Sequence, residues 1–378
     1  MPDVLLYSDT ERSAALRHEL PITIADPFGY AEVGGKATIF ISSLDQERAA
    51  AVRPDAAIIE WGDVGFHELL ESGMPRDQMI IEMISRAVAK TGLQDAIVDP
   101  DFPLAVADRL RADGVLLTPD HETFALRRRA KSDTELAGIR RAQKAAEAGM
   151  AAAAAILRAA VPEGDRIVVD GEPVTAEQVR DAIRAACAAA GAPAPPDIIV
   201  ASVWQGFGHE SGTGPLPANL PIHVDLWPRD EETNCWADMA RTFVVGTPDA
   251  RTLELDALTH EAHMAARDAI RPGITGRELH AIACDIFEAA GHATQRTGPG
   301  EDPNEGFQFS LGHGVGLEVH EDPGMGQSGR SPLVPGDVVA IEPGLWDRHV
   351  GALGSEDLVL VTEDGHEVLT DFPYDLKP

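Results

Sequence analysis

Several features that define other classes of protein are scarce or missing in this chain of 378 residues. Its three cysteines, Cys187, Cys235 and Cys284, are too few and too scattered for a disulfide framework or a CxxC site, which favours a reducing compartment. No apolar run approaches the roughly 20 residues needed to span a bilayer. The first residues lack a basic segment followed by a long apolar one, so we expect no secretory signal and a cytoplasmic location.

Positive charge is also in short supply. The chain has 31 Lys and Arg against 62 Asp and Glu, a formal net charge of −31. Phosphates would be repelled by such a surface, which argues against a nucleic acid as a partner. The acidic surface would favour a substrate that carries a positive amine, but an acidic coat for solubility is the simpler interpretation.

The length of the chain exceeds one ordinary core and predicts two domains. We expect an N-terminal α/β domain over residues 1–127, because short apolar runs alternate there with polar breaks. No cluster of His, Cys or carboxylates in it has the form of a site. The expected strands are 4–7, 21–24, 37–41 and 57–61, and the expected helices are 79–91 and 104–113.

A charge run at residues 127–131 marks the start of the second domain, residues 128–378. Ser132 and Glu135 then have the spacing of a capping box, and the stretch that follows to Ala160 is rich in helix formers, so one long helix is predicted. The other expected helices are 175–190, 253–270 and 276–290. The expected strands are 198–203, 222–227, 236–245, 338–342 and 358–361.

Carboxylates within otherwise apolar strands are the main anomaly of this second domain. In residues 222–226, side-chain alternation puts three apolar residues on one face of the strand and Asp225 on the other. Asp238 lies on the next expected strand, beyond a polar turn. Glu342 and Glu356 form a second such pair. If the two hairpins face each other, four carboxylates meet at one point.

Four carboxylates in one place would repel each other and take up protons unless cations neutralise them. A pair of divalent metal ions fits that charge. His313 lies in a glycine-rich loop and is a candidate nitrogen ligand. His260 and His263 also suggest a metal site, but they are three residues apart rather than the four of a zinc helix, so we interpret them as a solvated helix face.

Five segments of the second domain resemble metallopeptidase family M24, which includes methionine aminopeptidase, prolidase and aminopeptidase P. All five positions that carry metal ligands in that family hold the ligand residue type here. The resemblance extends over about residues 130 to 370 and implies a pita-bread catalytic domain, in an α/β (α+β) chain with a smaller, creatinase-like N-terminal domain. The segments are residues 223–228, 237–243, 312–323, 341–344 and 355–357.

The resemblance assigns the metal ligands. Asp225 would bind one ion, His313 and Glu342 the other, while Asp238 and Glu356 would bridge both. A water that bridges two such ions has a lowered pKa, so hydroxide forms near neutral pH. Glu342 would accept a proton from that water and pass it to the leaving amine. Carboxylates with one imidazole suit Mn²⁺ best, with Co²⁺, Fe²⁺ or Zn²⁺ as alternatives.

Two further histidines match positions near the scissile bond in the family. His320 would hydrogen-bond the substrate carbonyl or the developing oxyanion, and His209 would do so from the opposite side. The implied activity is that of an Xaa-Pro aminopeptidase or Xaa-Pro dipeptidase, with short peptides as substrates. The resemblance also implies a homodimer.

Two positions depart from the family pattern without removing a metal ligand. Aminopeptidase P and prolidase have a histidine where this chain has Phe309, and usually an arginine where it has Gly354. Both changes alter the substrate pocket. Two other functions stay open: a pita-bread binding module without catalysis, which would be expected to lack metal ligands, and a metal-independent creatinase-like amidinohydrolase, in which the acidic ligands would be replaced.

Overall fold

The computed structural model of the chain describes residues 2–203 and 210–378. The chain divides into two compact units, Met1–Arg128 and Arg129–Pro378; the boundary was expected after residue 127. Within the described residues, no helix combines the length and the apolar character needed to cross a membrane.

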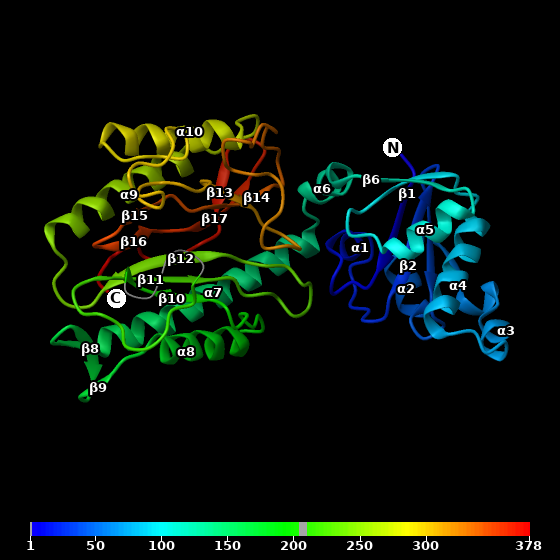
Figure 1. Cartoon of the computed structure of the whole chain (residues 1–378), viewed down its shortest axis with the longest axis horizontal. Helices are drawn as coiled ribbons and strands as arrows, with labels where there is room; N and C mark the ends of the chain where they lie inside the picture. The colour runs from blue at the N-terminus through cyan, green and yellow to red at the C-terminus, as the bar shows by residue number, and fades with distance from the viewer. Residues whose placement is uncertain (1, 204–209) are drawn as a thin grey trace. The chain divides into compact units, whose positions relative to one another are not determined.

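A six-stranded sheet with the order β4-β3-β2-β1-β5-β6 forms the centre of the N-terminal unit (Figure 1). Neighbouring strands pair antiparallel from β1 to β2 and β2 to β3, and parallel elsewhere. The predicted small α/β domain is therefore confirmed. Its strands are β1 (Val4–Ser8), β2 (Phe28–Val33), β3 (Lys36–Ile41), β4 (Ala57–Glu60), β5 (Asp95–Val98) and β6 (Leu116–Pro119). Its helices are α1 (Ala14–Glu19), α2 (Gln46–Val52), η1 (Trp61–Val64), α3 (Phe66–Glu71), α4 (Arg76–Thr91), α5 (Leu104–Ala112) and α6 (His121–Arg129).

The strand predicted at residues 21–24 is wrong. That segment is a loop whose end is tied to Thr10: the Ile24 amide donates to Thr10 Oγ1 at 2.7 Å, and the Ile24 carbonyl accepts from the Thr10 amide at 3.1 Å. Ile24 is buried there. Its apolar character therefore reflects packing of a loop against the core rather than a place in the sheet.

Four long helices of the C-terminal unit lie close to where the sequence places them. Helix α7 (Asp133–Ala159) begins with the predicted capping box, in which the Ser132 hydroxyl accepts from the Glu135 amide and the Glu135 carboxylate accepts from the Ser132 amide. Capping boxes also start α8 and α10. The other three helices are α8 (Ala176–Ala189), α9 (Ala250–Asp268) and α10 (Gly276–Ala289).

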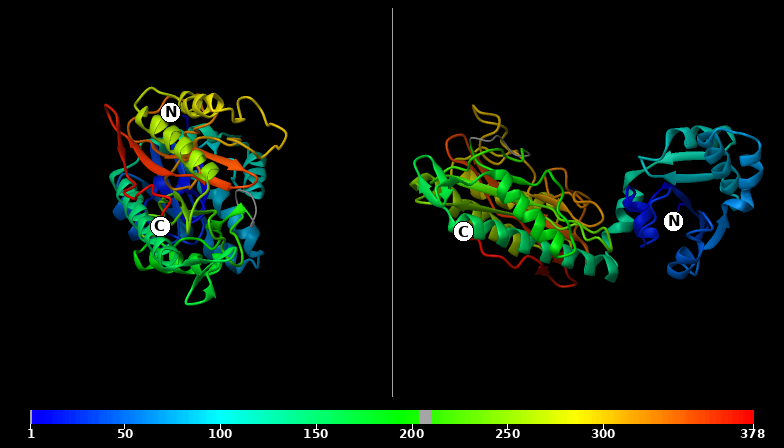
Figure 2. Two further views of the ribbon diagram at one scale, coloured as in Figure 1. Left: turned by 90° about the vertical axis from the view of Figure 1, so that its left-hand side faces the viewer. Right: turned by 90° about the horizontal axis from the view of Figure 1, so that it is seen from below.

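The strands of this unit lie between two pairs of helices. In Figures 1 and 2, α7 and α8 lie on one side of the strands and α9 and α10 on the other. Two sheets carry the candidate ligands: β10-β11-β12 and β13-β14-β17-β18. Their strands are β10 (Ile199–Ala201), β11 (Pro221–Leu226), β12 (Met239–Val244), β13 (Gly312–Gly314), β14 (Val338–Ile341), β17 (Asp357–Val361) and β18 (His366–Val368). Smaller sheets are formed by β7 (Val161–Glu163), β8 (Arg166–Val169) and β9 (Glu172–Pro173), and by β15 (Gly344–Asp347) and β16 (Gly351–Gly354).

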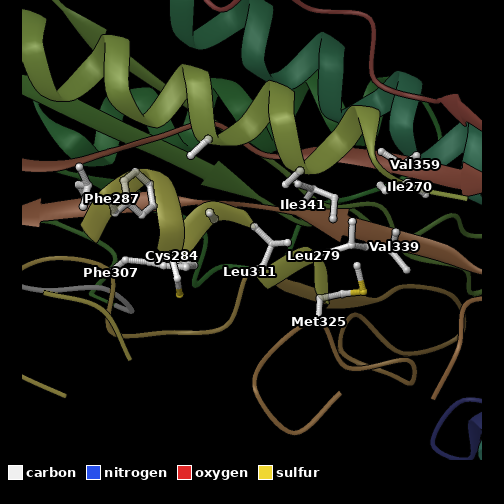
Figure 3. Packing of buried hydrophobic residues seen from close by; sticks show 14 of the residues in the cluster. Ile270, Leu279, Cys284, Phe287, Phe307, Leu311, Met325, Val339, Ile341 and Val359 are labelled. Atoms are coloured by element: carbon white, nitrogen blue, oxygen red, sulfur yellow. The ribbon is translucent and has the colours of Figure 1, made fainter. Parts of the chain in front are cut away.

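An apolar core holds the second of these sheets against α9 and α10. Figure 3 shows Leu279 and Phe287 of α10 facing the strand residues Val339, Ile341 and Val359, all fully or almost fully buried. Removal of this much apolar surface from water stabilises the position of β14 and β17. The ends of those two strands are consequently fixed.

A buried ion pair holds the two sheets together behind the ligand-bearing face. Arg241 of β12 donates to the Asp357 carboxylate at 2.9 Å and to the Glu356 carbonyl at 2.7 Å. It also donates to the carbonyls of Phe372 and Pro373, so the C-terminal segment is tied to the same guanidinium. Both side chains of the pair are almost fully excluded from water.

Replacing Arg241 with methionine is expected to lower the free energy of unfolding by about 3–5 kcal/mol, because Asp357 would lose its buried cation. Urea denaturation measures this change. Arg140→Met is the matched control: Arg140 forms a two-pronged ion pair with Glu367, but both side chains are about half exposed, so a loss of about 0–1 kcal/mol is expected. Equal losses in the two variants would contradict the structural role of Arg241.

Candidate metal centre

Strand β11 presents Asp225 on one face and buries its apolar residues on the other. Asp225 lies opposite Ala240 in the antiparallel pairing of β11 with β12, and Leu226 lies opposite Met239. Asp238 immediately precedes β12, so the turn between the two strands returns it to the neighbourhood of Asp225. The first predicted pair of carboxylates therefore lies at one end of a hairpin.

The second pair occupies the equivalent place in the other sheet. Ile341 lies opposite Asp357 where β14 pairs with β17, so Glu342 and Glu356 are placed just beyond that pair. The two sheets meet at this point, because the Glu356 amide donates to the Ala240 carbonyl at 3.0 Å. Backbone pairing thus brings together carboxylates that are up to 131 positions apart in the sequence.

The ligand atoms of these side chains converge. Carboxylate oxygens of Asp225, Asp238 and Glu356 lie within 4.8 Å of one another. A ring nitrogen of His313 and carboxylate oxygens of Glu342 and Glu356 form a second group within the same distance. Glu356 belongs to both groups. Such overlapping groups of oxygen and nitrogen donors are the arrangement that a pair of metal ions requires.

His313 is oriented as a ligand by its own backbone neighbour. Its Nδ1 lies 3.0 Å from the Gly314 carbonyl, an acceptor, so Nδ1 carries the proton and Nε2 has the free lone pair. Nε2 lies 3.6 Å from Asp238 Oδ2 and 3.6 Å from Glu342 Oε1. Burial and the neighbouring His320 lower the pKa of His313 to about 4, so the ring is neutral at pH 7 and able to bind a metal.

Without cations, the carboxylates are held away from their ordinary titration range. Burial raises the pKa of Asp225 to about 7, while burial and the charge of Asp225 raise the pKa of Glu342 to about 8. Burial and the adjacent acids raise the pKa values of Asp238 and Glu356 well above the ordinary range. Mutual repulsion in a dry site disfavours the charged forms, and bound cations would reverse that effect.

The environment of one buried oxygen, Asp225 Oδ1, indicates whether these residues fit metal ions. Asp225 Oδ1 is buried and has no hydrogen-bond partner within the part of the chain that the structure describes. A buried carboxylate oxygen without a partner is strongly unfavourable unless a cation compensates it. The donor set of carboxylates and one imidazole therefore fits a divalent metal.

Of the two histidines predicted to lie near the scissile bond, His320 is among the described residues and His209 is not. His320 is exposed, and its ring centre lies 4.2 Å from that of His313 with the rings nearly perpendicular. It also lies within ligand distance of Asp238 and His313, so it faces the same centre. His209 falls outside the described residues.

The interpretation of His263 as part of a solvated helix face is wrong. His263 is fully buried, and its ring nitrogens contact the Ser355 carbonyl and the Asp357 carboxylate, each at 3.0 Å. These are the residues on either side of Glu356. His263 therefore fixes the backbone that carries a ligand, a role that spacing along the helix did not reveal, whereas His260 is exposed as expected.

Comparison with known proteins agrees with this geometry. The model of metallopeptidase family M24 matches residues 137–363, more than half of the chain. The Xaa-Pro dipeptidase of Pyrococcus horikoshii is 39% identical over 134 residues, which are 35% of this chain and 35% of that protein. The chain therefore aligns with only about a third of the length of this curated relative.

Solved structures resemble the chain over almost its whole length. The prolidase from Pyrococcus horikoshii gives a TM-score of 0.77 at 22% identity, covering 100% of this chain and 95% of that one. The X-Pro aminopeptidase from Thermotoga maritima gives 0.76 at 19% identity, covering 98% and 96%. The predicted fold, a pita-bread unit preceded by a smaller α/β unit, is confirmed.

Metal binding is expected to release protons, because ligands that are protonated in the metal-free protein must ionise. With pKa values of about 7 and about 8, Asp225 and Glu342 should together release about one proton or more at about pH 6.5, and their share should fall as the pH rises through those values. The apparent affinity for Mn²⁺ should rise over the same interval. Calorimetric titration in buffers of different ionisation enthalpy measures the release; a pH-independent value near zero would contradict the raised pKa values.

Proposed function

Because the chain belongs to metallopeptidase family M24, we propose that it is a dinuclear metal-dependent peptidase that hydrolyses the N-terminal bond of short peptides. The observation that carries this proposal is the convergence of two ligand groups that share Glu356, together with the buried, unpartnered Asp225 Oδ1. The five proposed ligand side chains are Asp225, Asp238, His313, Glu342 and Glu356.

Asp225 is proposed to hold one ion, and His313 with Glu342 the other. Asp238 and Glu356 would be the shared ligands, in keeping with their deeper burial, at 4% and 2% exposed. Divalent ions in such a site supply Lewis acidity and lower the pKa of water toward neutrality. The predominance of carboxylates favours Mn²⁺, with Co²⁺, Fe²⁺ or Zn²⁺ as alternatives.

Glu342 and His320 are proposed to act on the substrate. The Glu342 side chain is 32% exposed, against 14% for His313 and 6% for Asp238, so it can reach both water and substrate. Its position at the edge of the centre suits a group that accepts a proton from water and passes it to the leaving amine. His320, exposed beside His313, donates a hydrogen bond to the scissile carbonyl as negative charge develops on its oxygen.

The finer activity proposed is that of an Xaa-Pro aminopeptidase or Xaa-Pro dipeptidase. The similarity to the Xaa-Pro dipeptidase of Pyrococcus horikoshii supports it over the part of the chain that aligns. Retention of the full ligand set argues against a silent binding module and against a metal-independent amidinohydrolase. His209 as a second substrate-binding histidine, the homodimer and the cytoplasmic location stay predictions.

We expect the Mn²⁺-loaded protein to cleave peptides with proline in the second position faster than matched peptides with alanine there. A panel of di- and tripeptides, with release of the N-terminal residue followed by chromatography, measures this. Equal rates for the proline and alanine peptides would contradict the preference for proline but not the peptidase activity. Absence of turnover with every peptide and every metal tried would refute the proposed peptidase activity.

Asp238→Ala should reduce kcat/KM by more than about a hundredfold while the chain stays folded. Loss of a residue that only hydrogen-bonds a metal ligand already costs about 10–100-fold, and loss of a shared ligand should cost more. Glu232→Ala is the control, since Glu232 lies in the turn of the same hairpin and 80% of its side chain is accessible. Circular dichroism checks folding in both variants. Full activity of Asp238→Ala would contradict the bridging role.

A further inference from the structure

Residues 313–321, which we call the histidine segment, fold back on themselves through Glu321. Gly314 and Glu321 pair antiparallel, and each amide donates to the other's carbonyl at 2.9 Å. The residue after His320 is thereby tied to the residue after His313, in keeping with the 4.2 Å between the two ring centres. The Glu321 carboxylate also accepts from the Glu318 amide at 3.4 Å, across the turn that contains His320. The direction in which His320 points therefore depends on where Glu321 is held.

Glu321 is held by a buried ion pair with Lys131. The Lys131 ammonium donates to Glu321 Oε1, and only 3% and 2% of the two side chains are exposed. Gly316 provides the space for the pair, because a Cβ there would lie 2.5 Å from Glu321 Oε1 and 2.9 Å from Lys131 Cε. Removing one partner from a pair this far from water leaves a strongly unfavourable charge, so the two ends stay together. The pair thus connects the interior of the histidine segment to the chain just before α7.

The backbone of Lys131 is fixed on both sides. Arg129, two residues earlier, donates to the Asp337 carboxylate at 2.9 Å and to the Pro332 carbonyl at 2.8 Å. Ser132, the next residue, is the N-cap of α7 and belongs to its capping box. The Lys131 ammonium is therefore presented from the start of a 27-residue helix rather than from a loose loop.

Helix α7 also has a fixed position relative to the hairpin of β11 and β12, which carries two of the proposed metal ligands. Gly138 of α7 contacts Thr233 in the turn of that hairpin so closely that a Cβ on Gly138 would lie 1.9 Å from Thr233 Oγ1. The same turn reaches the histidine segment directly, because the Trp236 amide donates to the Gly316 carbonyl at 2.8 Å. The Lys131–Glu321 pair is the side-chain part of this connection, and it ends one residue from His320.

We propose that Lys131, through Glu321, is a positioning residue for His320: the ion pair holds the imidazole where its hydrogen bond meets the oxygen of the scissile carbonyl. This inference rests on the proposed peptidase function, in which His320 donates that bond. Lys131 is too deeply buried to contact a substrate itself. A hydrogen bond aimed at the position where negative charge develops stabilises the transition state more than the bound substrate, so a displaced His320 lowers kcat more than it raises KM.

The first test removes both charges of the pair and asks whether the resulting loss requires His320. Lys131→Met/Glu321→Gln leaves neither partner with an uncompensated charge, unlike loss of one partner alone. In the Mn²⁺-loaded full chain it should lower kcat about tenfold or more and leave KM within about twofold. In a His320→Ala background the same two changes should lower kcat no more than about twofold further, because the residue that the pair positions is already absent.

Arg129→Met/Asp337→Asn is the matched control, because it neutralises another buried ion pair of the same segment, with 8% and 0% of the side chains exposed. Its effect on kcat should be the same with and without His320. Glu321→Asp, which keeps both charges but shortens the carboxylate by one methylene, should give a His320-dependent loss of about threefold or more even if the neutral double variant does not fold. Equal losses with and without His320 in the Lys131 and Glu321 variants would overturn the inference.

The second test locates the ring without relying on activity. Crystal structures of the unmodified chain and of Lys131→Met/Glu321→Gln should show the His320 ring displaced by about 1 Å or more, or in more than one orientation, with His313 and the four carboxylates unmoved. An unmoved His320 in a single orientation would overturn the inference and leave the peptidase function intact. An unmodified chain that cleaves no peptide would instead refute the peptidase function, and with it the inference that rests on it.

Discussion

Repulsion among the four clustered carboxylates is the interaction on which the C-terminal unit depends. Asp238 and Glu356 are almost fully excluded from water, and Asp225 and Glu342 are partly excluded. Burial raises all four pKa values, and neighbouring acids add to the shift for Asp238, Glu342 and Glu356. A folded chain holds such groups together only where other interactions oppose their separation and a cation stabilises their ionised forms. These groups therefore either take up protons or gain a positively charged partner, and a partner is needed for all four to be ionised.

The opposing interactions come from outside the site. Strand pairing fixes Asp225 opposite Ala240 and places Glu356 next to the same residue through a backbone hydrogen bond. The apolar core under α10 holds β14 and β17 from one side, and Arg241 holds the backbone of Glu356 from the other. The stability of the scaffold and the function of the centre are therefore linked, since the same contacts that fold the unit keep like charges close.

Sequence patterns within single strands and helices predicted much of the C-terminal unit. Side-chain alternation identified Asp225 as an anomaly, and the capping box at Ser132 located the start of α7. Tertiary contacts decided the rest. His263 shares a helix with exposed residues, yet it is buried by Ser355 and Asp357, which are more than 90 positions away. Likewise, the apolar run at residues 21–24 packs as a loop because its last residue, Ile24, is bonded to Thr10 rather than to a strand.

Anomalous diffraction from crystals grown with Mn²⁺ tests most directly whether paired cations neutralise this cavity. The electrostatics predict two anomalous peaks per chain, one bordered by Asp225 and the other by His313 and Glu342, with oxygens of Asp238 and Glu356 next to both. Saturating Mn²⁺ that yields no peak among these side chains, with the carboxylates still buried together, would contradict the claim that cations hold the centre in its ionised form.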